Sequence, residues 1–277
     1  MIVDYHMHLR GRANGREGPV ELTVEAVERF AAQAGERGVD EIAFTEHMYY
    51  FRQAEPFLSH PYHRGRVGHD LDDYCAAVLE AKSQGLPVKL GLEVEWLPGR
   101  EGELEEVLRP YPWDFLLGSV HLLDGKAVDM ESESGLWDRL PVEDVWRRYF
   151  AELAALARSG LADVLAHPDL VKIFGRRPAA EEVESHHAGA AAAFAETGVA
   201  VEASTAGLRK PVGELYPDLK FLRLCCEGGV GATLASDAHV AQAVGRDFEA
   251  GLDHLRSAGY ETVTVFDGRA GRQETLG

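Results

Sequence analysis

Apolar residues recur along this chain with two alternating periods, one typical of helices and one typical of short strands. Between residues 23 and 37, apolar side chains return every three or four positions, Thr23 can cap the first turn, and Gly38 follows the last turn. Short, mainly apolar runs separate segments of this kind. The pattern therefore predicts that helices and strands alternate along the chain.

Strands separated by helices of ten or more residues predict a parallel sheet with crossover helices. Seven or eight such units in sequence favour a closed, TIM-like α/β barrel over an open sheet. The expected strands span residues 2–8, 41–47, 88–93, 115–121, 163–167, 200–204, 231–239 and 262–266; the expected helices span residues 23–37, 70–84, 101–109, 141–158, 181–197, 214–227 and 245–258.

The alternation continues without a Pro-rich or low-complexity linker, so residues 1–277 are expected to form one domain. Residues 9–19 are expected to be a loop. Two longer irregular segments, residues 48–69 and 122–140, follow expected strands. They should lie at the carboxyl-end rim of the barrel, where active sites of such barrels lie.

The composition is that of an ordinary globular protein, with 45% hydrophobic and 27% charged residues. A formal charge of −18 argues against nonspecific binding to nucleic acid or to an anionic membrane. The three cysteines, Cys75, Cys225 and Cys226, do not form a disulfide framework. No segment is typical of a secretion signal or a membrane span, and we expect a cytoplasmic protein.

Candidate metal ligands gather where the expected strands end. On an extended strand, His6 and His8 leave the same face and can share a cation. In a barrel, eight imidazoles and carboxylates would converge on one mouth: His6, His8, His47, Glu93, His121, His167, Asp237 and His239. Such ligands suit zinc, iron or manganese, and they exceed the needs of one tetrahedral ion, which indicates a cluster of two or three.

Several assignments stay open at this level. Glu46 and Glu95 compete with their neighbours as ligands, and alternation sends Glu95 to the same face as Glu93. An amidohydrolase-type barrel also uses His-x-His but needs a bridging lysine, and Lys172 is poorly placed for that role. The remaining histidines are expected to be surface or structural residues: His60, His63, His69, His186, His187 and His254.

The ordered motifs resemble those of the PHP superfamily (polymerase and histidinol phosphatase), metal-dependent phosphoesterases built on a distorted (β/α)7 barrel. The motifs are His6-x-His8, Thr45-Glu46-His47, Gly91-Leu92-Glu93, Gly118-Ser119-Val120-His121, Ala166-His167 and Ser236-Asp237-Ala238-His239. Within the superfamily, residues 118–121, 172–175 and 204–211 are most similar to the histidinol-phosphatase branch.

The resemblance implies a first metal held by His6, His8, Glu93 and Asp237. Glu93 would bridge to a second metal, which also takes His121 and His167, and a third would use His47 and His239. Relatives have a further histidine in the loop after the first strand, whereas this chain has Arg12, which cannot ligate a metal. The third site is left open between an empty site, completion by water or Glu17, and replacement by Arg12 as a phosphate clamp.

The resemblance also implies a function, the hydrolysis of L-histidinol phosphate to L-histidinol and phosphate. Two metal ions would lower the pKa of a water molecule and stabilise both reacting oxygens at phosphorus. Arg209 is the expected bidentate phosphate contact and Lys210 a weaker candidate. Asp237 or His239 would pass a proton to the leaving alcohol.

Two alternatives remain, a PHP phosphoesterase for another small phosphate ester or nucleotide, and a noncatalytic metal-binding module. The expected partner is a small phosphorylated substrate, without nucleic acid or membrane. Acidic residues of the long loops could receive a cationic imidazole or amine, and the sequence does not rank them: Asp70, Asp72, Asp129 and Glu131.

Overall fold

Seven parallel strands form the centre of the molecule. The computed structural model describes residues 1–13, 16–130 and 135–277, and it leaves out the side chains of residues 10–17 and 135. In spatial order the strands are β1 (Val3–Asp4), β4 (Glu41–Phe44), β5 (Val88–Glu95), β6 (Phe115–Ser119), β9 (Val164–Leu165), β10 (Ala200–Ser204) and β11 (Ala232–Ala235). Every neighbouring pair in this order is parallel, as the sequence predicted.

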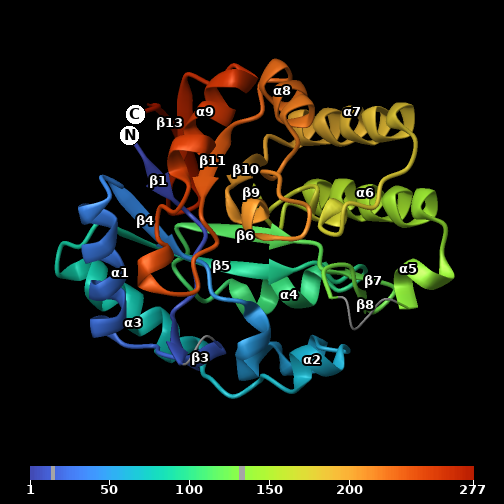
Figure 1. Cartoon of the computed structure of the whole chain (residues 1–277). Coiled ribbons are helices and arrows are strands. Elements are labelled where there is room, and N and C mark those ends of the chain that lie inside the picture. Colours follow the sequence, from blue (N-terminus) through green and yellow to red (C-terminus); the bar gives the residue numbers. More distant parts are fainter. Residues whose placement is uncertain (14–15, 131–134) are drawn as a thin grey trace.

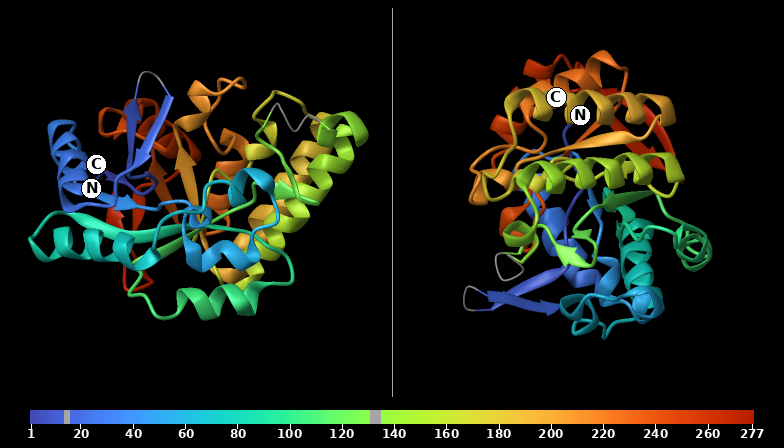
Figure 2. Two further views of the ribbon diagram at one scale, coloured as in Figure 1. Left: turned by 90° about the horizontal axis from the view of Figure 1, so that it is seen from below. Right: turned by 90° about the vertical axis from the view of Figure 1, so that its right-hand side faces the viewer.

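The first and last strands of this sheet meet, so the sheet curls into a nearly closed barrel (Figures 1 and 2). The backbone N–H of Tyr5 donates to the carbonyl of Leu234 at 3.0 Å. The buried carboxylate of Asp4 accepts from the backbone N–H of Ser236 at 2.9 Å and from its hydroxyl at 2.5 Å. Residues from both ends of the chain therefore lie side by side at the same end of the barrel.

Helices cover the outside of the barrel (Figure 2). They are α1 (Val24–Glu36), α3 (Leu71–Ser83), α4 (Glu101–Leu108), α6 (Val142–Ser159), α7 (Ala180–Thr197), α8 (Leu219–Glu227) and α9 (Phe248–Ala258). The hydroxyl of Thr23 accepts from the N–H of Ala26 and caps α1, as predicted. None of the helices that the structure describes is long and apolar enough to cross a membrane.

Three details differ from the expectation. Helix α8 begins at Leu219 instead of residue 214, because Pro217 precedes its cap and Asp218 accepts from the N–H of Lys220. Part of the expected loop at residues 9–19 forms an antiparallel hairpin of β2 (Arg10–Ala13) and β3 (Arg16–Val20).

The third difference is the last expected strand. β12 (Thr262–Asp267) pairs antiparallel with β13 (Ala270–Thr275) in a separate two-stranded sheet, so the barrel has seven strands. Val263 and Phe266 of β12 pack with Tyr5 and Phe115 in a buried cluster. The last apolar run therefore packs against the core without joining the barrel.

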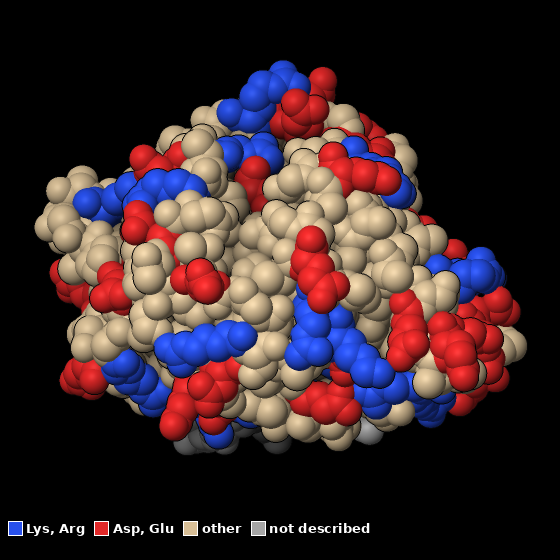
Figure 3. Space-filling model, turned by 90° about the horizontal axis from the view of Figure 1, so that it is seen from above, with Lys and Arg blue, Asp and Glu red and all other residues tan. Residues whose placement is uncertain are grey.

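Short elements cover the carboxyl ends of the strands. After β4 come η1 (Met48–Tyr50), η2 (Arg52–Phe57) and α2 (Pro61–Arg64); after β6 come β7 (Leu122–Leu123), β8 (Lys126–Ala127) and α5 (Gly135–Arg139). η4 (Leu170–Lys172), η5 (Ala206–Arg209) and η6 (Ala241–Ala243) follow β9, β10 and β11. On the face shown in Figure 3, basic side chains lie among acidic ones.

Candidate metal centre

The eight predicted ligand residues lie together at the carboxyl ends of the strands. His6 and His8 follow β1, His47 follows β4, Glu93 belongs to β5, His121 follows β6, His167 follows β9, and Asp237 and His239 follow β11. All of them except His8 line one cavity with a water-accessible volume of about 150 Å³. The strand-end pattern in the sequence therefore corresponds to one cluster in space.

Glu93 lies at the centre of this cluster. Its Oε2 atom lies 3.6 Å from Nε2 of His6 and 3.9 Å from Nε2 of His8. Its Oε1 atom lies 3.5 Å from Nε2 of His121 and 3.4 Å from Nε2 of His167. The two oxygens of one carboxylate thus face two different sets of histidines, which is the arrangement that a bridging carboxylate requires.

Asp237 adds a carboxylate oxygen next to His6 and His8. Oδ1 of Asp237 lies 3.3 Å from Nε2 of His8 and 3.9 Å from Nε2 of His6. In the described part of the chain, three groups have ligand atoms within 4.8 Å of one another: His6, His8 and Asp237; His6, Glu93 and His167; and His8, His47 and His239.

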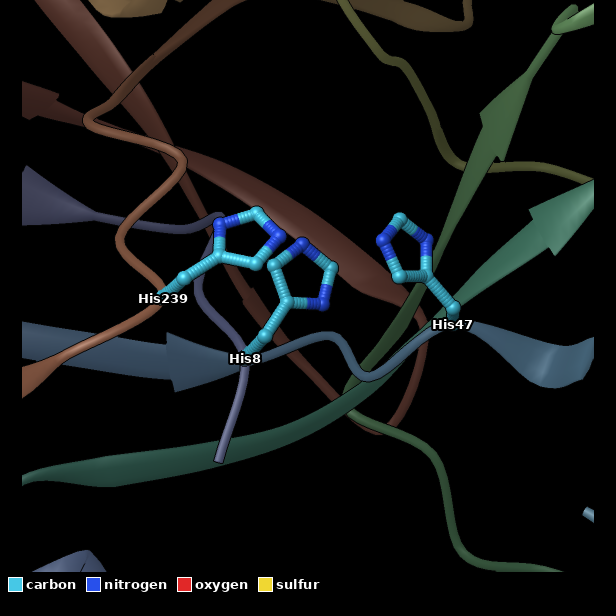
Figure 4. Close-up of side chains that lie close together, drawn as sticks. All are labelled: His8, His47 and His239. Carbon is cyan, nitrogen blue, oxygen red and sulfur yellow. The ribbon is translucent and has the colours of Figure 1, made fainter. Parts of the chain in front are cut away.

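The third group consists of imidazoles only. The ring centroid of His8 lies 4.1 Å from that of His47 and 4.3 Å from that of His239. Figure 4 shows that these rings, from segments after β1, β4 and β11, point into the same space. The side chains of Arg12 and Glu17, which the sequence raised for this position, lie outside the described residues.

A second layer of carboxylates orients the histidines. Nδ1 of His6 donates to Glu202 at 2.7 Å, and Nδ1 of His8 donates to Glu46 at 3.2 Å. Nε2 of His6 and Nε2 of His8 are buried and have no hydrogen-bond partner among the described residues. Metal-binding histidines in proteins are held in this way, with one nitrogen fixed by a carboxylate and the other aimed at the ion.

The same pattern clarifies the two carboxylates that the sequence left open. Nδ1 of His121 donates to Glu95 at 2.8 Å. Glu46 and Glu95 thus accept from the Nδ1 atoms of His8 and His121, while Glu93 lines the cavity. The sequence reasoning missed Glu202, although a charged residue in the middle of the apolar strand β10 was a signal that could have identified it.

The charges of the cluster balance one another. Burial alone would raise the pKa of Glu93, but His47, His6 and His121 hold it well below its usual value. Burial alone would lower the pKa of His121, but Glu95 and Glu93 raise it to about 10. The buried carboxylate of Glu93 is therefore ionised and needs positive charge nearby. Protons on the histidines or divalent cations can supply that charge, so the donor set fits such ions.

The predicted phosphate contacts are placed differently from one another. Lys210 lines the cavity, whereas Arg209 does not. The guanidinium of Arg209 donates to Asp247 at 2.9 Å and to the carbonyl of Ser236 at 2.5 Å. Of the two predicted phosphate contacts, Lys210, which the sequence ranked second, is thus the one that lines the cavity.

Two further sequence expectations concern residues near the cavity. His63, expected to be a surface or structural residue, lines the cavity. Lys172, the lysine considered for an amidohydrolase-type site, is buried and binds Asp169 at 2.8 Å and the carbonyl of Leu215 at 2.8 Å. Lys172 therefore ties η4 to the loop before α8.

Comparison with known proteins agrees with the geometry. The family description "PHP domain" matches residues 23–206. A protein named "Probable histidinol-phosphatase" from Deinococcus radiodurans is 34% identical over 95% of this chain and 96% of its own length. A "Histidinol-phosphatase" from Lactococcus lactis subsp. lactis is 24% identical over 96% of this chain and 94% of its own length.

Solved structures show the same fold. A histidinol phosphate phosphatase from Lactococcus lactis, solved with zinc, L-histidinol and phosphate, superposes with a TM-score of 0.74 at 20% identity and covers 98% of each chain. The crystal structure of a protein from Listeria monocytogenes superposes with a TM-score of 0.75 at 21% identity. The match covers 90% of this chain and 99% of the Listeria chain. The predicted resemblance and the distorted seven-stranded barrel are confirmed, and the chain belongs to the PHP domain family.

Proposed function

We propose that this protein is a metal-dependent phosphatase that hydrolyses L-histidinol phosphate to L-histidinol and phosphate. The observation that carries the proposal is the position of Glu93, whose two carboxylate oxygens face two sets of histidines inside one cavity. The relative from Deinococcus radiodurans, whose name states this activity, supports the choice of substrate. The Lactococcus lactis structure with zinc, L-histidinol and phosphate supports it further.

The residues divide into two sites for divalent ions, zinc, iron or manganese. His6, His8 and Asp237 would hold the first ion together with Glu93. His121, His167 and Glu93 would hold the second. His47 and His239 remain for a third ion. When bound, such ions lower the pKa of water and neutralise charge on a phosphate.

The protein's own side chains bind the phosphate and move the proton. Lys210 places a positive charge on the cavity wall. Tyr216 also lines the cavity, and its hydroxyl is buried without a hydrogen-bond partner among the described residues, so we assign it as a donor to a phosphate oxygen. Oδ1 of Asp237 lies 3.4 Å from Nδ1 of His239. This pair passes a proton to the leaving alcohol.

A phosphate-release panel on one zinc-loaded preparation tests the proposal. We expect the highest kcat/KM for L-histidinol phosphate, well above the values for nucleoside monophosphates and glycerol phosphate. Glu93→Gln should abolish phosphate release and reduce the bound zinc measured by elemental analysis, while the exposed Glu103→Gln should change neither. Efficient hydrolysis of a nucleotide with none of histidinol phosphate would contradict the substrate assignment.

A further inference from the structure

The cavity contains side chains that neither the ligand groups nor the phosphate contacts use. They come from the two segments that cover the rim after β4 and β6, and they are Tyr49, Tyr62, His63 and Asp129. Asp70 and Asp72, two of the acids that the sequence could not rank, lie elsewhere. Asp70 caps α3, and Asp72 accepts a hydrogen bond from Tyr111 at 2.8 Å. Glu131 is outside the described residues.

Asp129 carries a buried oxygen that lacks a donor. Its Oδ1 atom is buried and has no hydrogen-bond partner in the part of the chain that the structure describes. A carboxylate oxygen that is removed from water without a donor is unfavourable unless a ligand supplies one. The position of Asp129 on the cavity wall means that a ligand in the cavity can do so.

Asp129 lines the cavity but belongs to none of the candidate metal-ligand groups that the described residues form. Of the carboxylates that line the cavity in the described chain, Glu93 and Asp237 belong to the ligand groups and Asp129 does not. It is not needed to orient His121 either, because Nδ1 of His121 already donates to Glu95 at 2.8 Å. The charge of Asp129 also helps to raise the pKa of His121, but its Oδ1 atom has no donor among the described residues, so a bound molecule can supply one.

Aromatic rings line the same cavity as Asp129. Tyr49 and His63 stack with their ring centroids 4.3 Å apart and their planes at 3°. Nδ1 of His63 is buried without a hydrogen-bond partner among the described residues. Burial, with the charges of His121 and His60, lowers the pKa of His63 to about 3, so this imidazole stays neutral and does not repel a cation. Flat rings and a carboxylate within one cavity suit a small cationic molecule with a ring of its own.

We propose that Asp129 determines the specificity for the alcohol half of the substrate. Its carboxylate accepts a hydrogen bond from the ammonium group of a phosphorylated amino alcohol, and the substrate's ring packs among Tyr49, Tyr62 and His63. This inference rests on the proposed phosphatase function and names the chemical class that the cavity selects, a phosphomonoester with a cationic amine.

The variant Asp129→Asn tests the assignment, with Asp124→Asn as a matched control. Asp124 lies in the turn of the β7–β8 hairpin, which Asp129 follows by two residues, but the side chain of Asp124 is 71% exposed and pairs with Arg148 away from the cavity. The two probes are the separate products, L-histidinol and inorganic phosphate, titrated calorimetrically into zinc-loaded protein. We expect Asp129→Asn to weaken L-histidinol binding about 10- to 100-fold and to change phosphate binding less than about threefold.

Kinetics provide the second readout. For Asp129→Asn, kcat/KM for L-histidinol phosphate should fall by the same factor, while kcat/KM for p-nitrophenyl phosphate, which has no amine, should stay nearly constant. Equal losses for both substrates would overturn the proposal, because they would place Asp129 in the metal machinery; so would no loss for either. Bound zinc and the melting temperature should match those of the wild type.

The outcome remains interpretable if the proposed substrate is wrong. In that case the wild type would cleave other phosphomonoesters without cleaving histidinol phosphate, and phosphoethanolamine and glycerol phosphate would replace it as a cationic and a neutral substrate. A wild-type preference for phosphoethanolamine that disappears in Asp129→Asn would support the role of Asp129. A wild type without such a preference would overturn it.

Discussion

Glu202, in the middle of the buried strand β10, accepts hydrogen bonds from two of the candidate ligand residues. Its Oε2 atom accepts from Nδ1 of His6 at 2.7 Å, and its Oε1 atom accepts from the backbone N–H of His167 at 3.2 Å. One carboxylate thereby orients the His6 ring of one proposed ion site and holds the backbone of His167, a residue of the other. The side chain of Glu202 is almost fully buried, so these two contacts are its main interactions.

We expect Glu202→Gln to weaken zinc binding and to lower kcat/KM by about 10- to 100-fold each, because an amide orients the His6 ring less strongly than a carboxylate. Competition with a chromophoric chelator measures the affinity. The control is Glu196→Gln, which removes only an exposed ion pair with Arg158. Unchanged zinc affinity in Glu202→Gln would contradict the orienting role.

The buried imidazole of His63 should make stability depend on pH. Its folded pKa is about 3 and its ordinary value 6.5, so acid protonates the unfolded chain first and stability is lost as pH falls below 6.5. Between pH 7 and pH 5 the loss attributable to this group is about 2 kcal/mol.

Denaturant unfolding of metal-free protein at both pH values, compared with His63→Phe, measures this loss. The variant should lose about 2 kcal/mol less between pH 7 and pH 5 than the wild type. Parallel pH profiles for the two proteins would show that His63 is accessible to protons in the folded state.

At the level of single residues, the sequence could predict that the candidate ligands lie together, because each of them lies near the end of a strand or just after one, and strand ends are visible in a local pattern. Glu202 could not be found in this way, since its partner His6 is 196 residues distant along the chain. The position of Lys210 on the cavity wall, and of Arg209 in its contacts with Asp247 and Ser236, is not indicated by any periodicity in the sequence. The roles of these residues depend on contacts that form only when the chain folds, and the residue types along the sequence do not show these contacts.

At the level of elements, the turn η5 depends on a glycine. A Cβ atom at Gly207 would lie 2.0 Å from the carbonyl oxygen of Glu214 and 3.0 Å from Cε2 of Tyr216. Gly207 therefore allows the segment after β10 to pack closely against the segment that carries Tyr216 into the cavity.

Gly207→Ala should lower the free energy of unfolding by about 1–3 kcal/mol. It should also reduce phosphate release, because the displaced backbone moves Tyr216. Gly189→Ala is the matched control. Gly189 lies in α7 with no atom within 4 Å of an added Cβ, so the change should stabilise the protein by about 0.5–1 kcal/mol. Wild-type stability of Gly207→Ala would contradict the close packing.

The helices were predictable because each has an apolar face, and in α6 that face buries Val145, Trp146, Tyr149 and Leu153. The hairpin β2–β3 and the strand β13 were not predictable. Their residues are mostly polar or glycine, so no alternation of apolar and polar positions distinguishes them from loops. Elements that pack against the core were thus found, and those supported mainly by backbone pairing were missed.

At the level of the whole molecule, the buried charges of the cluster should couple metal binding to folding. Loading with zinc at one hundred times its dissociation constant should add about 2.7 kcal/mol to the free energy of unfolding, which raises Tm by at least about 5 °C. Calorimetry with zinc and with excess chelator measures the shift. The variant Glu93→Gln should show a smaller shift, and equal melting curves with and without zinc would contradict the coupling.

The closure of the barrel between β1 and β11 has a consequence for how the protein is made. On a ribosome, β1 emerges early and its hydrogen-bonding edge stays open until residues 232–235 follow. The contacts of Asp4 with Ser236, and those of His8 with Asp237, form only then. A nascent chain therefore cannot assemble the proposed first ion site until Asp237 has been synthesised.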